Sequence, residues 1–414
     1  MISTARAAIL LIIYAQFLLI PRISSAETDV SSKTYLKFYT DAWDEKYAPL
    51  YEYLELQSRD RQQGLWNFYL SGWWGRDFST VQDDKRTRDD LTNAFVSISP
   101  YQNRKLVLTA GRHYVFEGVA AEKIDGLSGR WEITPERGVA LFGGVPVETE
   151  FDNRKGDSTY GGRIYQRILR KAEIGFSFFN EDNNRSRYRQ EAGVDLWALP
   201  IKSAEIKGHS YYNTITEGWG EHAYTLRLFP AETVVLSGSY SRTNYGDAFS
   251  AHTLSVFSPE FLGKDEQLTK KGGSIEYRFG ADASGVLDYV NYSYNTMGAA
   301  DYFGGKVSRS IAGISSGISL HRMNGAVEKL RYTESRIYGV KDGEAWRFSL
   351  DALNLHYDLP VNGIGDAYWL NGAIRYAISP SLSAACSVDY GKTPEFDYTT
   401  TALLTLVYNF KGGE

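Results

Sequence analysis

The stretch Ala402-Leu-Leu-Thr-Leu-Val-Tyr-Asn-Phe410 carries large apolar side chains at every second position. Successive side chains of a β-strand point to opposite faces, so Leu404, Leu406, Tyr408 and Phe410 share one side. An aromatic residue closes that apolar face. This arrangement is typical of a strand that crosses an outer membrane.

The same alternation recurs in about 22 runs of about ten residues along the rest of the chain. Clear examples are residues 65–74, 91–99, 105–112, 171–180, 233–240, 346–355 and 381–390. No apolar stripe of helix length follows Ile20. A backbone in lipid must satisfy all its N–H and C=O groups internally, so only helices and closed barrels span membranes. The sequence therefore predicts an all-β fold, a transmembrane antiparallel β-barrel of about 20 to 22 strands.

Composition agrees with a barrel. Hydrophobic residues make up 43% of the chain, and the mixture has 30 Tyr, 20 Phe, 9 Trp and 39 Gly against 3 Met. Only every second residue of a barrel strand meets lipid, which lowers the mean hydropathy, and Tyr and Trp collect at the two membrane interfaces. A secreted β-sandwich or propeller is the competing class, because alternation alone fits it as well.

The N-terminus has the three parts of a secretory signal peptide. A basic start ending at Arg6 precedes an apolar run over residues 7–20 and the small residues Ser24-Ser25-Ala26. The run is shorter than the roughly 20 residues that span a bilayer, which disfavours an uncleaved anchor. We expect residues 1–26 to be the signal peptide and residues 27–414 to form one outer-membrane barrel domain.

Two kinds of turn alternate along the chain. Short turns with Pro or Gly fall at residues 99–100, 134–138, 199–200, 229–230, 279–280 and 379–380. Long polar stretches fall between them at residues 77–90, 151–158, 181–187, 244–269 and 391–398. Outer-membrane barrels pair short periplasmic turns with long outer loops, which predicts that both termini are periplasmic. The pattern is weakest over residues 34–56 and 302–322.

The lumen of such a barrel is wide. Strands about 4.8 Å apart and tilted by about 40° give a diameter of roughly 40 to 45 Å, with on the order of 25 Å free inside. Natural barrels near 22 strands usually carry a plug, but residues 27–33 are too few for one. We expect either that long loops such as residues 244–269 fold inward or that another protein fills the lumen. A 16-strand count would reduce the barrel to an ordinary pore.

Charged residues mark two candidate sites in this lumen. Five lie around one outer turn within residues 111–129: Arg112, Glu117, Glu122, Lys123 and Asp125. They would form a constriction or a docking surface, or else solvate and pair as charges in a polar lumen commonly do. Arg163 and Arg167 share strand parity, so we expect them to line the lumen and favour anions. The arginines at 185, 187 and 189 are expected to lie on a surface loop.

Motifs for cofactors and catalysis are missing. The lone Cys386 excludes disulfides within the chain, cysteine-based zinc sites and covalent haem attachment. The spacing of the six histidines favours no metal site. No Gly-x-Ser-x-Gly elbow is present, and we expect no enzyme activity, metal or cofactor. Without residues 1–26 the chain has 43 basic and 50 acidic residues, which argues against nucleic acid as a partner.

Several segments resemble the porin-like barrels of porin–cytochrome electron conduits in metal-reducing bacteria. They are residues 48–54 (APLYEYL), 71–77 (SGWWGRD), 118–126 (GVAAEKIDG), 142–148 (FGGVPVE) and 160–163 (YGGR), all in the first half of the chain. The resemblance implies an insulating sheath in the outer membrane, in which a periplasmic and an outer-surface multihaem c-type cytochrome meet. Haem would then belong to these partners alone, and lumen-facing Tyr, Trp and charged residues would form the interface. A diffusion porin for small hydrophilic solutes is the alternative.

Overall fold

The computed structural model describes residues 26–40, 45–60, 64–79, 87–100, 105–147, 156–183, 186–248, 266–396 and 398–412. Apart from Ala26, the expected signal peptide lies outside these residues, as do residues 249–265 of the long stretch 244–269. In the described part of the chain, two short helices, α2 (Tyr245–Ala248) and η3 (Glu328–Leu330), accompany the strands. Within the described ranges no helix is long and apolar enough to cross a membrane.

Antiparallel strands make up nearly all of the described chain. The strands are β1 (Ala26–Thr40), β2 (Lys46–Tyr47), β3 (Pro49–Asp60), β4 (Trp66–Asp77), β5 (Thr87–Ile98), β6 (Leu106–Glu117), β7 (Ala120–Thr134), β8 (Arg137–Pro146), β9 (Gly156–Ile168), β10 (Ala172–Asn183), β11 (Ser186–Ile201), β12 (Ala204–Asn213), β13 (Gly218–Ala231), β14 (Val234–Asn244), β15 (Gln267–Arg278), β16 (Ala283–Tyr294), β17 (Gly298–Ile311), β18 (Ile314–Gly325), β19 (Tyr332–Asp342), β20 (Trp346–Val361), β21 (Ile364–Ser379), β22 (Leu382–Lys392) and β23 (Thr399–Gly412).

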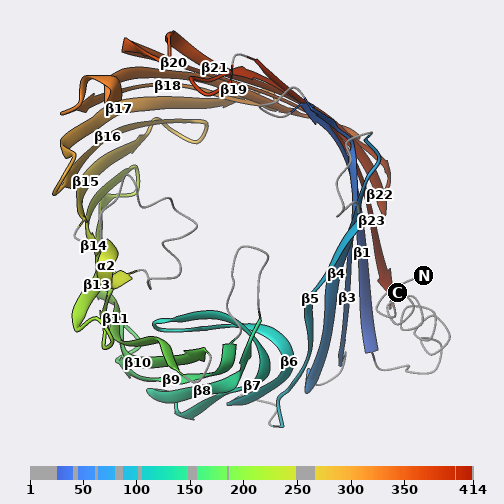
Figure 1. Ribbon diagram of the computed structural model, residues 1–414, viewed down its shortest axis with the longest axis vertical. Coiled ribbons are helices and arrows are strands. Elements are labelled where there is room, and N and C mark those ends of the chain that lie inside the picture. Colours follow the sequence, from blue (N-terminus) through green and yellow to red (C-terminus); the bar gives the residue numbers. More distant parts are fainter. Residues whose placement is uncertain are drawn as a thin grey trace.

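These strands close into a ring (Figure 1). The two-residue β2 pairs only with β1, and the other 22 strands each pair with their neighbours along the chain. The last strand, β23, closes the ring on β1 from Thr28↔Gly412 to Tyr39↔Thr401. A closed sheet leaves no free edge, so every backbone group can find a partner within the wall. The predicted barrel is therefore confirmed, at the upper end of the expected strand count.

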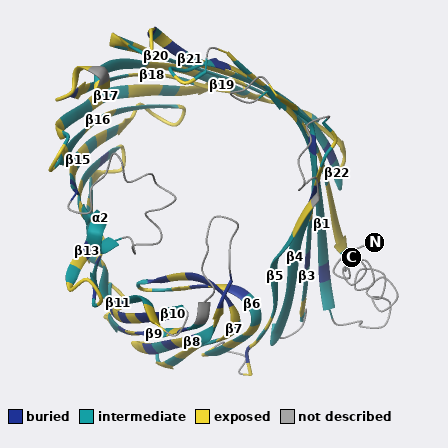
Figure 2. Ribbon diagram, viewed as in Figure 1, coloured by how far each residue is buried: buried dark blue, intermediate teal, exposed yellow. Residues whose placement is uncertain are grey.

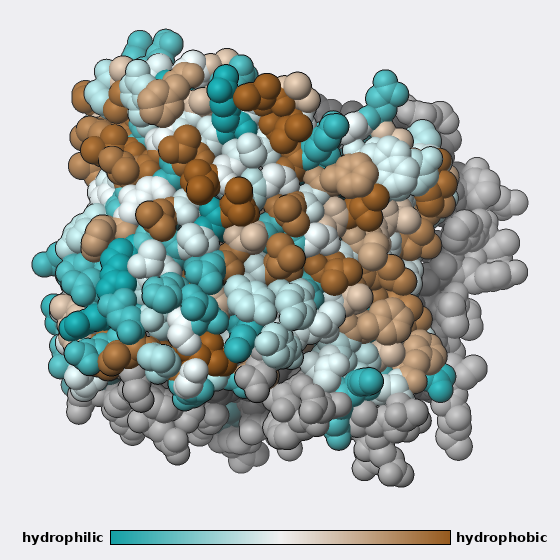
Figure 3. Space-filling model, turned by 90° about the horizontal axis from the view of Figure 1, so that it is seen from above, coloured by the Kyte–Doolittle hydropathy of each residue, from teal (hydrophilic) through white to brown (hydrophobic). Residues whose placement is uncertain are grey.

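Register places the large apolar side chains on the outer face. Ile318 of β18 pairs with Val307 and Ile337 on its two neighbours, and all three are more than half exposed. Exposed and less exposed residues accordingly alternate along many strands in Figure 2. Seen from the side, apolar side chains cover much of the wall, and hydrophilic ones gather toward one end (Figure 3). This is the surface expected of a wall that faces lipid.

The two kinds of turn lie at opposite ends of the barrel, because consecutive strands run in opposite directions. The weakly patterned residues 302–322 form the β17–β18 hairpin, whose turn is Ala312-Gly313. Both turn residues have positive φ, 49° and 76°, which Gly adopts readily and Ala does not. Residues 34–56, the other weak region, contain parts of β1, all of β2 and the start of β3.

Candidate functional site

The pairing between neighbouring strands β5 and β6 stops partway along their length, where a hairpin leaves the wall. Strands β5 and β6 pair over only five positions, from Ala94↔Arg112 to Ile98↔Leu108. Beyond Arg112, β6 continues paired to β7 alone, up to Glu117↔Ala120 at the Gly118-Val119 turn. We call residues 112–125 the inner hairpin.

A row of glycines lies where the inner hairpin bends away. Gly111 of β6, Gly126 of β7 and Gly144 of β8 stand side by side in register. A Cβ at Gly126 would come within 2.2 Å of the Gly143 carbonyl oxygen, and Gly111 has φ +116°. Only residues without a side chain allow the strands to approach and twist this closely. The glycines therefore let the sheet fold over itself.

The inner hairpin lies across the inner surface of β8 to β10 (Figure 1). The Val119 N–H donates to Ser177 Oγ of β10 at 3.0 Å. Val119 Cγ1 also lies 2.3 Å from where a Cβ would stand at Gly193 of β11. Ser177 is on the face of β10 opposite to the exposed Phe176 and Phe178. The strands β10 and β11 are three and four places away from β7 in the wall. The hairpin can contact them only by lying across the inner surface of the strands between.

A small apolar core holds the inner hairpin in place. Val115, Ala120 and Ile124 of the hairpin pack with Phe142 of β8 and Phe179 of β10. All five are at most 6% exposed, and Ile124 and Phe179 are fully buried. Burial contributes roughly 1.5–3 kcal/mol for each of the four larger side chains, those of Val115, Ile124, Phe142 and Phe179. The hairpin is therefore packed against the wall as part of the fold.

Arg163 and Arg167 belong to a network on the inner face beside the hairpin. Arg163 donates from Nε to Asp195 at 2.9 Å and from Nη2 to Glu173 at 2.8 Å. Arg167 donates to Glu173 at 2.9 Å and to Glu132 at 3.0 Å. Each arginine thus bridges two carboxylates, and the two share Glu173. Their positive charges are compensated, which removes the basis for the expected preference for anions.

The tip residue Glu117 reaches the same network. It lies 3.7 Å from Arg130 of β7, which, with Arg163 and Arg167, stands over the ring of Tyr165 at 4.9–5.6 Å. Arginines favour the face of an aromatic ring because of its quadrupole. The candidate residues Glu117, Arg163 and Arg167 are therefore brought together in one network.

Arg112, Lys123 and Asp125 form a second cluster at the base of the inner hairpin. Arg112 makes a two-pronged contact with Asp125 at 2.8 and 2.7 Å and donates to the Leu91 carbonyl at 2.9 Å. Asp90 of β5 lies 3.8 Å from Arg112 and 3.7 Å from Lys123. These contacts join the hairpin to the part of β5 that pairs with β4 but no longer with β6. Their arrangement indicates a structural clasp.

Glu122, the last candidate, faces Arg189. Arg189 donates to Glu191 at 2.7 Å, lies 3.8 Å from Glu122 and stands 4.6 Å over the ring of Phe179. The expectation that Arg189 lies on a surface loop is wrong, because β11 begins at Ser186 and carries this arginine into the wall. The first residues of β11 are polar, as in a loop, because this part of the strand lies beyond the apolar band.

Carboxylates outnumber arginines along this part of the lumen. The networks around the inner hairpin contain four arginines, at 130, 163, 167 and 189, and six carboxylates, at 117, 122, 132, 173, 191 and 195. The residues at 132, 173, 191 and 195 were not among the sequence candidates. Alternation along each strand, combined with the register of each hairpin, would have placed them on the inner face. This wall therefore favours cations or a basic partner surface. In the described part of the chain, no three His, Cys, Asp or Glu side chains gather as a metal site.

A second stretch of inner wall is aromatic. Tyr35 and Tyr53 meet edge to face with centroids 5.4 Å apart, Tyr53 and Trp73 lie at 6.3 Å, and Tyr69 and Phe95 stack at 5.3 Å. Three of these tyrosines line a cavity of about 510 Å³ together with Lys33, Glu55 and Asn93. Aromatic rings with polar edges are common at protein interfaces.

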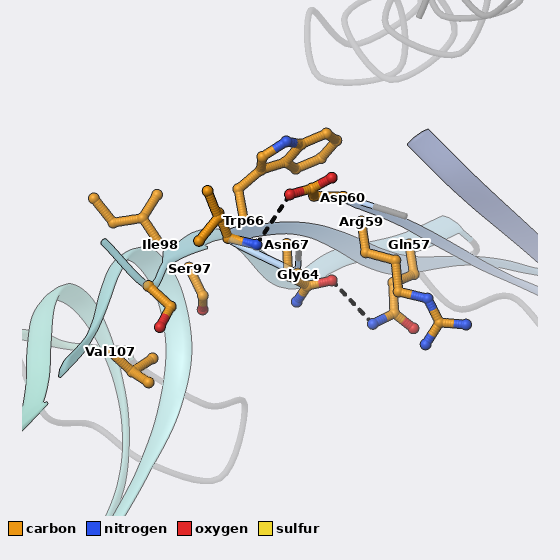
Figure 4. Close-up of a pocket in the computed structure, with 11 residues that line it drawn as sticks. Gln57, Arg59, Asp60, Gly64, Trp66, Asn67, Ser97, Ile98 and Val107 are labelled. Atoms are coloured by element: carbon orange, nitrogen blue, oxygen red, sulfur yellow. Dashed lines mark hydrogen bonds between the residues drawn. The ribbon is translucent and has the colours of Figure 1, made fainter. Parts of the chain in front are cut away.

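A smaller cavity of about 280 Å³ lies where β3 ends and β4 begins, at the rim with the short turns, and Figure 4 shows the residues that line it. There the Leu65 N–H donates to the Asp60 carboxylate at 3.2 Å, and Gln57 donates to Asn67 at 3.0 Å. Arg59, which also lines it, pairs with Glu27 at 2.9 Å. These contacts hold β3 against its neighbours β1 and β4 and mark no separate site.

Neither protein-family models nor curated proteins match this sequence. Among solved structures, a mutant of the ferric enterobactin receptor PfeA of Pseudomonas aeruginosa matches with a TM-score of 0.60 at 10% identity, over 93% of this chain and 80% of that one. OccAB4 of Acinetobacter baumannii matches with a TM-score of 0.46 at 10% identity, over 94% of this chain and 98% of that one. Similarity at this identity shows the fold alone. The chain therefore has the fold of an outer-membrane β-barrel.

Proposed function

We propose that this barrel is the outer-membrane sheath of a porin–cytochrome electron conduit. The observation that carries the proposal is the closed ring of 22 strands, whose described residues contain strands, turns and two short helices but no plug domain. A ring of that size leaves on the order of 25 Å inside. An unobstructed hole of this width would leak solutes across the membrane. A protein in the lumen would close it.

The inner wall offers a surface for such a partner. The aromatic stretch around Tyr53 and Trp73 adjoins, across β5, the acidic stretch beside the inner hairpin. Aromatic residues supply contact area, and the excess of carboxylates favours a basic partner surface. Redox chemistry would belong to the cytochromes, since the chain has no means of binding haem covalently. Its own contribution would be position and electrical insulation.

The test is purification of the tagged barrel from outer membranes of its native host in mild detergent, followed by a visible absorption spectrum. The proposal expects haem absorption at near-stoichiometric amounts, together with c-type cytochromes identified by mass spectrometry. A colourless barrel of full length, recovered from cells that make cytochromes, would contradict it.

A diffusion porin for small hydrophilic solutes is the second candidate, and the inner hairpin favours it. A hairpin folded against the inner wall, with charged side chains around it, narrows the lumen as a selectivity element would. The excess of carboxylates predicts a preference for cations. Steady conductance of the isolated barrel in planar bilayers, with a cation-selective reversal potential in a KCl gradient and no haem on purification, would support this function over the sheath.

A further inference from the structure

The outer face of β13, β14 and β15 changes character toward the end where the long loops lie. Leu236 pairs with Leu228 and Ile275, and these three side chains form part of the apolar band. Two steps further along the same face of β14 is Gly238, followed by Tyr240 and then Arg242. Apolar residues, then tyrosine, then a cation is the order of hydrocarbon, interface and headgroup layers.

Neighbouring strands repeat this order. Tyr240 stands between Tyr224 of β13 and Lys271 of β15. Arg242 and Lys271 therefore lie on adjacent strands, one alternate position apart, where long side chains reach the same point. Both are exposed. The pair forms a cationic spot directly above two interfacial tyrosines.

Both cations lack an acidic partner among the described residues. Arg242 donates to the neutral Gln267 Oε1 at 2.7 Å, and no described carboxylate lies within 4.0 Å of either cation. Another arginine at this end of the outer face is neutralised, since Arg322 pairs with Asp358. Counting only residues that the structure describes, the spot keeps two unneutralised positive charges next to the membrane surface.

We propose that Arg242 and Lys271 bind a phosphate group of a lipid in the outer leaflet. The guanidinium provides two parallel donors that match phosphate oxygens, and the ammonium adds a point charge. Tyr224 and Tyr240 then contact the part of the lipid just below the phosphate. A lipid is the source of the phosphate because the site is on the membrane-facing side of the wall, continuous with the apolar band. The inference depends on the barrel lying in an outer membrane and does not depend on the cytochromes.

The test is native mass spectrometry of the purified full-length barrel in detergent, with bis-phosphorylated lipid A as the probe. The wild type is expected to retain one lipid A, and an Arg242→Gln/Lys271→Gln variant to bind it about tenfold more weakly. A Lys270→Gln/Lys306→Gln variant is the matched control. It removes the same charge, but Lys270 and Lys306 are on the inner face of β15 and β17, so binding should equal the wild type. Heat-modifiable migration on gels confirms folding of each variant.

Ligand controls separate the sources of phosphate. Lipid A stripped of its phosphates should bind about tenfold more weakly than intact lipid A, and millimolar inorganic phosphate should leave intact lipid A bound. Equal binding by the Arg242→Gln/Lys271→Gln variant and the wild type would overturn the site. Equal binding of stripped lipid A, or displacement by inorganic phosphate, would overturn the assignment to a lipid phosphate.

Discussion

Arg163 is the least exposed of the candidate residues, at 7%, and makes three hydrogen bonds to Asp195 and Glu173. Replacing it by Met would leave Asp195 without its arginine partner and Glu173 with Arg167 alone. The expected loss is about 2 kcal/mol of unfolding free energy, below the range for fully buried pairs because lumen water screens the carboxylates. Denaturant unfolding of the refolded barrel measures it.

The matched control for this substitution is Arg347→Met. Arg347 pairs with Asp342 at 3.5 Å, but both side chains are more than half exposed. Exposed pairs contribute little, so this variant should differ from the wild type by less than about 0.5 kcal/mol. Equal losses in the two variants would mean that the Arg163 network has no special role in stability.

Glu266 gives the barrel an acid-sensitive contact outside the strands. It is solvent-inaccessible and accepts hydrogen bonds from Thr296 Oγ1 and the backbone N–H groups of Asn295, Thr296 and Gln267. Burial alone would raise the pKa of Glu266, but these hydrogen bonds together hold it below the ordinary value. The contact therefore stabilises the folded state at neutral pH and is lost as the pH falls below about 4.3, through the folded-state pKa.

A Glu266→Gln variant tests this pH dependence. At pH 7 it should be less stable than the wild type by about 1 kcal/mol, because the amide cannot accept the same set of hydrogen bonds as a carboxylate. At pH 3 the difference should be smaller, because the unfolded chain then binds a proton at Glu266 more readily than the folded chain does. Thermal unfolding at both pH values measures it. A gap that stays constant between pH 7 and pH 3 would contradict the argument.

At this scale the sequence predicts which residues share a face, but not which ones meet. Alternation places Arg163 and Arg167 on one side of a strand, and the structure has both on the inner face. Their partners Glu132, Glu173 and Asp195 come from three other strands. Partner identity depends on register and hairpin length, and no local pattern specifies either.

Among the elements, the inner hairpin is the one whose position is most open to a direct test. Val119 Cγ1 lies 2.3 Å from the Cβ position at Gly193, so adding one C–C bond brings the two Cβ atoms within about 3.8 Å. That separation suits a disulfide. In a Cys386→Ala background, Val119→Cys with Gly193→Cys should crosslink under mild oxidation, detected by mass spectrometry of peptides.

The control pairs Val119→Cys with Gly317→Cys. Gly317 is on the inner face of β18, which is separated from β7 by many strands of the ring. No crosslink is expected. If the Gly317 pair crosslinked as readily as the Gly193 pair, the hairpin would not be packed against β8 to β11.

Strand boundaries show what alternation can report. The predicted runs 65–74, 105–112 and 346–355 begin within a residue of β4, β6 and β20, but these strands continue to Asp77, Glu117 and Val361. All three extensions are at the end with the long loops. Apolar alternation arises only where one face meets lipid, so hydrogen-bonded strand beyond the bilayer has no such signal. The strand segments of the inner hairpin were not predicted for the same reason, because neither of their faces meets lipid.

For the whole molecule, closure by β23 is the feature on which folding depends. Its removal would leave the edges of β1 and β22 unpaired over twelve and ten positions. Unpaired backbone groups in lipid cost several kcal/mol each. A chain ending at residue 398 should therefore fail to give the heat-modifiable, protease-resistant barrel that the full chain gives. A protease-resistant barrel from the shortened chain would show that closure can be achieved without β23.

At this largest scale the sequence was most informative. The number of alternating runs, the phase of the two kinds of turn and the absence of helical stripes are sufficient to predict a closed barrel near 22 strands. What fills or narrows the lumen could not be predicted in the same way. In sequence, a hairpin that leaves the wall looks like one that stays in it, because its two strands still pair with each other across a short turn. Only the glycines at 111, 126 and 144 mark the bend.

Pairing of Thr28 with Gly412 places the two ends of the barrel strands side by side on one rim. A short linker between Gly412 and Ala26 would make the wall a continuous loop of chain. Reopening it at the Asn362-Gly363 turn, on the opposite rim, would give a circular permutant with the same strand order and both termini exchanged to the other side of the membrane. The same barrel can in this way carry a reporter facing either compartment.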